Sequence, residues 1–231
     1  MDTTQFLYGI LSGMLPSLLW LWFWLKENNL HPEPRRLLAT CFFFGMVAVL
    51  LAFPLQYFVS LVFTDDLHRY VLWAVIEEIL KFGVVYFIII SKQQMDEPID
   101  ALIYMITSAL GFSALENTFF MLKAINTSTV VSTIITGNLR FMGALLLHVV
   151  CSALVGFMIA LAFNSSRGAK AVAAFIGIVI AGTLHATFNL AIINGTTSST
   201  MQAFAWVWGG VIVLALLFEE VKAMKPKTAT Q

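Results

Sequence analysis

The chain has 231 residues, of which 59% are hydrophobic and 11% charged. Soluble domains carry about 25% charged residues, so this composition excludes a soluble globular protein and indicates a polytopic membrane protein. The formal net charge is +0 and no basic cluster interrupts the chain, so nothing in the sequence suggests a nucleic-acid partner.

Seven apolar stretches follow one another along the chain, and a membrane-spanning helix needs roughly 20 apolar residues. The first stretch has no basic segment before it and no small-residue cleavage site after it, which favours a retained helix over a cleaved signal peptide. We therefore predict an all-α membrane protein of about seven transmembrane helices, forming one membrane-embedded domain over residues 1–231. The stretches cover residues 6–25, 37–63, 68–90, 99–122, 139–163, 170–193 and 201–218.

The connections between these stretches differ in their basic residues, and lysine and arginine gather on the cytoplasmic side of membrane proteins. The first, third and fifth connections and the C-terminal tail contain nine of them, against two in the opposite connections. This asymmetry predicts an N-out, C-in topology. The nine are Lys26, Arg35, Arg36, Lys92, Arg167, Lys170, Lys222, Lys225 and Lys227, and the two are Arg69 and Lys123.

Two further features are expected to be structural. The β-branched segment 125–138 (INTSTVVSTIITGN) is too short for a span. We expect an ordinary connector there, with a surface-lying lid or substrate-binding loop as the alternative. Cys41 and Cys151 both lie in apolar runs, so we expect them to be small packing residues and not a disulfide.

A few polar residues interrupt the apolar stretches, and intramembrane ionisable groups are candidates for functional sites because each is costly to insert. The third stretch contains two glutamates and a lysine, the fourth a glutamate, the fifth an arginine and a histidine, and the sixth a histidine. The full set is Glu77, Glu78, Lys81, Glu116, Asn117, Arg140, His148, His185 and Asn189.

The depths of these residues converge under the predicted topology. At a rise of 1.5 Å per residue, Glu77 lies roughly 14 Å from the outer end of its helix, Glu116 roughly 9 Å, His148 roughly 13 Å and His185 roughly 12 Å. Four helices thus bring a carboxylate or an imidazole to a similar level. We predict a polar catalytic cavity in the outer half of the bilayer.

Spacing on the third helix suggests different roles for its two glutamates. Lys81 follows Glu77 by four residues and Glu78 by three, so it can reach either carboxylate. One glutamate kept ionised and one free to exchange a proton would suit general acid–base catalysis. Alternatively, His148, His185 and a glutamate could bind Zn²⁺. The sequence leaves the cofactor open between none and zinc, with a slight preference for the metal-free glutamate–histidine form.

The ordered motifs EEILK, DEPIDALIYMITSALGFSALEN, an Arg–His helix and HATFN, with the loop HPEPRRLL before them, resemble the PrsW family of intramembrane proteases. The resemblance runs over about residues 32–193. PrsW proteins are similar to the CAAX-prenyl endopeptidases, whose double glutamate is followed by arginine, whereas this chain has lysine at a shorter spacing.

The resemblance implies hydrolysis of a membrane-anchored protein near the outer face of a bacterial cytoplasmic membrane; known members act on anti-sigma factors. Matched to the motifs of this family, the catalytic positions that the resemblance implies are Glu77, Glu78, Glu116, His148 and His185. Asn189 corresponds to the asparagine that follows the last histidine of the family motif.

Other mechanisms fit less well. The zinc motif H-E-x-x-H is absent, and Asp100 has no partner for a two-aspartate protease. The GFSA sequence at 111–114 makes Ser113 with His185 a runner-up serine mechanism, but it leaves Glu77 and Glu78 without a role. Outside the proteases, a proton-coupled transporter or channel, an inactive membrane scaffold and a purely structural ion-pair network are the alternatives.

Overall fold

The computed structural model describes residues 2–28, 32–193 and 196–224, and every element in that part of the chain is helical. The elements are α1 (Thr3–Glu27), α2 (Arg35–Val62), α3 (Asp66–Val85), the π-helical turn η1 (Tyr86–Ile90), α4 (Pro98–Thr127), α5 (Val130–Leu139), the π-helical turn η2 (Arg140–Ala144), α6 (Leu145–Leu161), α7 (Arg167–Ile193) and α8 (Thr197–Ala223). The all-α prediction is confirmed.

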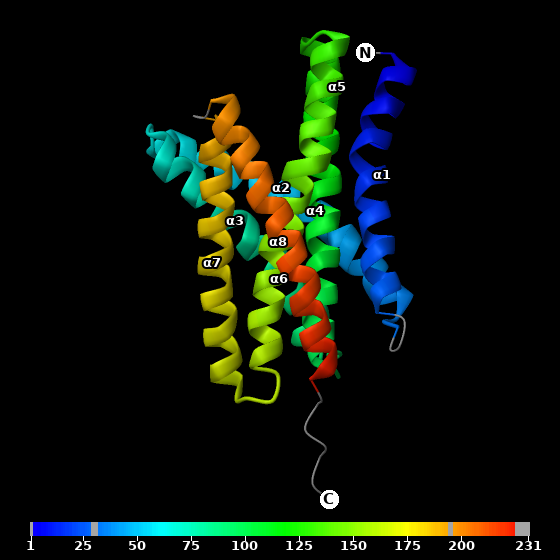
Figure 1. The fold of residues 1–231 in the computed structure, drawn as a ribbon, viewed down its shortest axis with the longest axis vertical. Coiled ribbons are helices and arrows are strands. Elements are labelled where there is room, and N and C mark those ends of the chain that lie inside the picture. The colour runs from blue at the N-terminus through cyan, green and yellow to red at the C-terminus, as the bar shows by residue number, and fades with distance from the viewer. Residues whose placement is uncertain (1, 29–31, 194–195, 225–231) are drawn as a thin grey trace, which may run out of the picture.

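Each of the seven predicted stretches is helical, and six helices among the described residues are long and apolar enough to cross a membrane. The exception is α3, because its charged residues Glu77, Glu78 and Lys81 interrupt its apolar sequence. Long helices run up and down between two ends of the bundle (Figure 1). We call the end where α1 begins the upper end and the end where α8 finishes the lower end.

The ends of α1, α3 and α6 and the finish of α8, which lie next to the more basic connections and tail, are at the lower end, whereas the end of α4 is at the upper end (Figure 1). Lys225 and Lys227 lie outside the described residues. The start of α1 and the finish of α8 lie at opposite ends, as an odd number of crossings requires. The arrangement agrees with the predicted N-out, C-in topology, which stays a prediction.

Helix α4 forms the centre of the bundle. Of an 18-residue apolar window within it, 94% is buried, because α1, α2 and α6 all pack against it. Glycines allow this close approach: a Cβ atom added at Gly45 of α2 would overlap the Ser108 carbonyl, and one at Gly111 of α4 would overlap the Phe42 carbonyl. Helices α7 and α8 complete the fold by packing on α6.

The segment 125–138 is not the connector that we expected. Its first residues finish α4, and α5 then continues through η2 into α6 as one long rod. The Thr129 hydroxyl caps α5 by accepting a hydrogen bond from the Ser132 backbone N–H at 3.3 Å. The β-branched side chains Val130, Val131 and Ile134 are exposed, as suits a helix that faces lipid.

Candidate active site

Three charged residues of α3, Glu77, Glu78 and Lys81, are buried in the centre of the bundle. Lys81 Nζ donates a hydrogen bond to Glu78 Oε1 at 2.6 Å, and both side chains are 0% exposed. Ser152 Oγ of α6 donates to Glu78 Oε2 at 2.9 Å, and the Lys81 ammonium lies 4.9 Å from the centre of the Phe112 ring. Lys81 therefore forms its ion pair with Glu78, and Glu77 has no ion pair with a lysine in the described part of the chain.

The two histidines are oriented by carboxylates. His185 Nδ1 lies 3.0 Å from Glu78 Oε1, and His148 Nε2 lies 3.2 Å from Glu116 Oε2. Because a carboxylate accepts hydrogen bonds, these two nitrogens carry the protons. The lone pairs are then on His185 Nε2 and on His148 Nδ1, and Lys81 Nζ donates to His148 Nδ1 at 2.9 Å.

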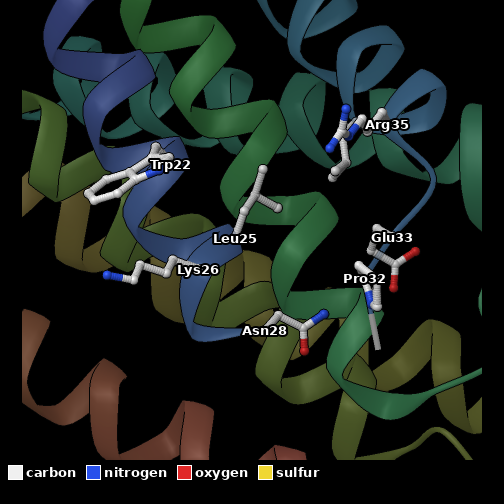
Figure 2. A pocket seen from close by; sticks show the side chains of 8 residues that line it. Trp22, Leu25, Lys26, Asn28, Pro32, Glu33 and Arg35 are labelled. Atoms are coloured by element: carbon white, nitrogen blue, oxygen red, sulfur yellow. The ribbon is translucent and has the colours of Figure 1, made fainter. Parts of the chain in front are cut away.

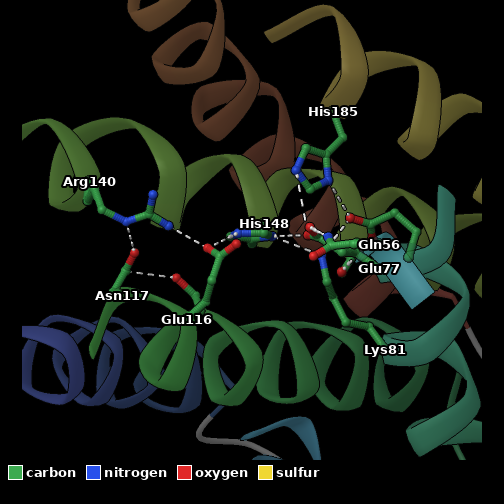
Figure 3. A network of polar contacts seen from close by, with 11 residues as sticks. Gln56, Glu77, Lys81, Glu116, Asn117, Arg140, His148 and His185 are labelled. Atoms are coloured by element: carbon green, nitrogen blue, oxygen red, sulfur yellow. Dashed lines mark hydrogen bonds and ion pairs between the residues drawn. The ribbon is translucent and has the colours of Figure 1, made fainter. Parts of the chain in front are cut away.

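Glu77 lies between these two lone pairs (Figure 3). Its Oε1 accepts a hydrogen bond from Gln56 Nε2 of α2 at 2.8 Å. Its Oε2 is buried without a hydrogen-bond donor, 3.8 Å from His148 Nδ1 and 3.7 Å from His185 Nε2. Three hydrogen-bond acceptors thus face one another, an arrangement that a cation or a water molecule among them would stabilise.

This donor set fits a zinc ion. Ligand atoms of Glu77, His148 and His185 all lie within 4.8 Å of one another, and two histidines with one glutamate are a known zinc-binding combination. Ligands at 2.0–2.2 Å from a tetrahedral ion lie about 3.3–3.5 Å apart, close to the separations here. The carboxylate partners of both imidazoles fix the ring orientation, as in metal sites generally. One of the three acceptors is shared: the lone pair of His148 Nδ1 also accepts a hydrogen bond from Lys81.

A second group of possible ligands, Glu78, Cys151 and His185, is equally compact. Here, however, Glu78 already accepts from Lys81, His185 and Ser152, whereas Glu77 Oε2 has no donor. The first group is therefore the better candidate for a metal. Cys151 is fully buried with a free thiol.

Glu116 and Arg140 form the edge of the cluster. The Arg140 guanidinium forms an ion pair with Glu116 and donates from Nε to Asn117 Oδ1 at 2.5 Å. It also lies 3.8 Å from the centre of the Phe120 ring. The Glu116 and Arg140 side chains are 13% and 17% exposed, so this side reaches the surface. Arg140 projects from η2, a wide helical turn of a kind that often occurs at functional sites.

The structure brings eight of the nine predicted polar residues into one network (Figure 3). The exception is Asn189, half-buried one turn beyond His185 on α7. No hydrogen bond joins it to the described members of the network. Ser113 accepts from Asn117 Nδ2 at 3.1 Å and has no hydrogen bond to His185, so the described contacts do not support the serine mechanism.

The expected polar cavity is closed. Glu77 is 4% exposed and His148 and His185 are 2% exposed each, because the charged groups pack directly against one another. Two described pockets lie instead at the lower end of the bundle. One is lined by residues from the end of α1 and the start of α2, including Trp22, Lys26 and Arg35 (Figure 2).

Sequence reasoning missed two residues of the site. Gln56 is the single amide in the apolar run of α2, and that isolation is a signal that could have identified it. Ser152 follows His148 by four residues and therefore lies on the same face of α6. Both donate to a glutamate of α3.

Together, the fold and the site define a polytopic membrane protein with a buried glutamate–histidine centre. A family model described as "PrsW family intramembrane metalloprotease" matches residues 33–219. The chain belongs to the PrsW family, and the resemblance noted from its motifs is confirmed. The match includes every residue of the network and extends through most of α8.

Two curated relatives are both named "Protease PrsW". The protein from Geobacillus kaustophilus is 31% identical over 119 residues, which are 49% of this chain and 52% of that protein. The protein from Oceanobacillus iheyensis is 29% identical over 115 residues, 48% of this chain and 53% of that protein. Each alignment thus spans about half the length of the relative. No solved structure matches the chain.

Proposed function

We propose that this protein is an intramembrane endopeptidase that hydrolyses a peptide bond in a membrane-anchored protein. The observation that carries the proposal is the buried, unpartnered Glu77 Oε2 facing two imidazole lone pairs. A structural ion-pair network would give this oxygen a donor. A site that holds a reactant or a metal leaves it free.

We favour a zinc-dependent form, in which Glu77, His148 and His185 hold the ion. A zinc ion supplies a Lewis acid that activates water and polarises the peptide carbonyl. Glu78 and Glu116 hold the protonated nitrogens of the two imidazoles and so keep their lone pairs directed at the centre. Glu116, at the exposed edge, is our candidate for the general base.

In the metal-free form, Glu77 Oε2 itself takes the proton from water. The water oxygen adds to the carbonyl carbon, the C–N bond breaks, and the proton passes to the departing amine. Both forms depend on Glu77. They differ in whether the three acceptor atoms face zinc or water, and in whether Glu116 or Glu77 is the general base. The donor set and the description of the family favour zinc.

A proton-conducting transporter gains no support from the hydroxyl groups of α4. Thr107 Oγ1 donates to the Ile103 carbonyl at 2.7 Å, and Ser108 Oγ donates to the Lys81 carbonyl at 3.1 Å. The Tyr104 hydroxyl donates to Glu33 at 2.6 Å. Each hydroxyl is satisfied locally, so no hydrogen-bond chain connects the described groups from the lower end to the cluster.

We further propose that the chain forms one membrane domain in a bacterial cytoplasmic membrane, with its upper end outside. The test of the protease function compares the membrane-protein cleavage products of cells that express the wild type or Glu77→Gln. Fragments that appear with the wild type and vanish with Glu77→Gln would support the proposal. Identical profiles, at equal protein levels, would contradict it.

A further inference from the structure

Lys81 has a second contact in the centre of the bundle besides its ion pair with Glu78. Its ammonium lies 2.6 Å from Glu78 Oε1 and 2.9 Å from His148 Nδ1. The other ring nitrogen of His148 lies against Glu116, so Nδ1 has the lone pair that could bind a metal ion. A lysine cation therefore holds one ligand position of the candidate metal site.

The ammonium of Lys81 is fixed by its surroundings. Its side chain is 0% exposed, and the ring of Phe112 on α4 lies 4.9 Å from the ammonium. On the same helix, Ser108 Oγ donates a hydrogen bond to the Lys81 backbone carbonyl at 3.1 Å. The contact with His148 is thus part of the packed core and differs from the passing contacts of a flexible surface lysine.

A metal ion and the Lys81 ammonium need the same atom. An imidazole nitrogen has a single lone pair, which accepts a hydrogen bond or binds a metal ion. The hydrogen bond between Lys81 and His148 must therefore break before His148 can become a ligand. A metal ion on Nδ1 would also lie close to the ammonium, and like charges repel strongly in a buried site.

The charge of the network favours the same competition. Three carboxylates share the site with two cationic side chains, the members being Glu77, Glu78, Glu116, Lys81 and Arg140. With neutral imidazoles the network has one negative charge, which a divalent ion would change to one positive charge. Buried net charge is costly. Lys81 therefore stabilises the metal-free site and opposes the entry of another cation.

We propose that Lys81 competes with zinc for His148 and so controls the metal affinity of the site. The inference rests on the zinc-dependent form of the proposed function and adds a regulation of that site. In the metal-free protein, Lys81 occupies the lone pair of His148 Nδ1. In the metal-bound protein, the ammonium keeps its ion pair with Glu78 and gives up its hydrogen bond to His148.

The test removes the ammonium without leaving a buried charge unpaired. Lys81→Met alone would leave the Glu78 carboxylate without its counter-ion. The informative comparison is therefore between Glu78→Gln/Lys81→Met and Glu78→Gln, two proteins that differ only at residue 81. The introduced amide still offers an oxygen to His185 and an N–H group to Ser152 Oγ. The double variant should also regain melting temperature, because it contains no unpaired lysine.

Zinc affinity is measured on the full-length protein in detergent, by competition with a chromophoric chelator. We expect the double variant to bind zinc about 10–100-fold more tightly than Glu78→Gln, as loss of a competing hydrogen bond from a charged group implies. Nitrogen-15 NMR of labelled histidine should show His148 Nδ1 hydrogen-bonded in the metal-free wild type and metal-bound once zinc is added.

A surface pair provides the matched control. Lys222 and Glu219 form an ion pair of 2.6 Å with the same spacing of three residues, far more exposed than the central pair. Glu219→Gln/Lys222→Met should bind zinc with the same affinity as Glu219→Gln. This control shows whether a change of net charge alone alters zinc binding.

Equal or weaker zinc binding by Glu78→Gln/Lys81→Met would overturn the proposal, and so would failure of all variants to bind zinc. A His148 Nδ1 that stays hydrogen-bonded to lysine in the zinc-loaded wild type would also overturn it. Cleavage of a single-span reporter is measured separately. A protein that cleaves without this competition retains the proposed protease function, whereas competition without cleavage supports the inference and counts against the protease function.

Discussion

Lys81 Nζ lies 2.6 Å from Glu78 Oε1, and neither side chain reaches the surface. This pair gives two neighbouring glutamates different environments. Glu78 is surrounded by donors, whereas Glu77 Oε2 has none. The contrast indicates that Glu78 mainly maintains the site and that Glu77 faces the reaction.

The two glutamates should therefore respond differently to substitution by glutamine. Glu78→Gln leaves a buried lysine without its counter-ion, which destabilises a protein by about 3–5 kcal/mol, so its melting temperature in detergent should fall. Glu77→Gln keeps an acceptor for Gln56 and should melt like the wild type. If Glu77 is the base, its loss should lower cleavage of a single-span reporter about 10²–10⁴-fold. Normal cleavage by a well-folded Glu77→Gln would remove Glu77 from the mechanism.

Zinc content tests the ligand assignment. Purified protein should contain about one equivalent of zinc, which His148→Ala and His185→Ala should lose. Cys151→Ser is the control, because Cys151 belongs only to the second, less suitable group of ligands. Loss of zinc in Cys151→Ser would shift the assignment to that group. Full activity of the metal-free protein after chelation would leave the glutamate–histidine form.

Much of the fold and of the site could be predicted, because insertion into a bilayer constrains a sequence strongly. Long apolar runs predict the helices, and rare polar residues within them identify the network. Pairing is harder to predict: both glutamates lie within reach of Lys81 by spacing, and only packing selects Glu78. Gln56 was missed because an isolated amide carries no charge, and its contact joins residues 21 apart in sequence.

The predicted topology can be tested with single cysteines. Thr129 caps the start of α5 at the upper end, and Gln94 lies in the exposed turn at the lower end. An impermeant thiol reagent applied to intact cells should label Thr129→Cys and spare Gln94→Cys. The native Cys41 and Cys151 are buried, so background labelling should be low. The reverse pattern would invert the predicted orientation.

Close packing of α2 against α4 should make Gly45 intolerant of a side chain. A Cβ there meets the Ser108 carbonyl, a backbone atom that cannot move aside cheaply. Overpacking of this kind destabilises a protein by about 1–3 kcal/mol, so Gly45→Ala should lower the melting temperature. Gly83→Ala is the control, since a Cβ there meets no atom within 4 Å. Equal melting of the two variants would contradict the observed helix approach.

Gln56 should act as a positioning residue for Glu77. Its Nε2 donates to Glu77 Oε1 at 2.8 Å, and its backbone carbonyl accepts from Trp73 Nε1 at 3.0 Å. Gln56→Leu keeps the approximate size and that backbone contact but removes the side-chain donor. Loss of a hydrogen bond behind a metal ligand typically lowers metal affinity or activity 10–100-fold.

The decisive experiment therefore measures both the zinc affinity and the melting temperature of Gln56→Leu. A merely structural role would lower the melting temperature and leave the affinity of the folded protein unchanged. A positioning role would weaken zinc binding at an almost constant melting temperature. Trp73→Phe serves as the control, because it removes the bond to the Gln56 backbone and spares the amide that donates to Glu77. If Gln56→Leu binds zinc and cleaves the reporter like the wild type, the hydrogen bond to Glu77 does not position the site.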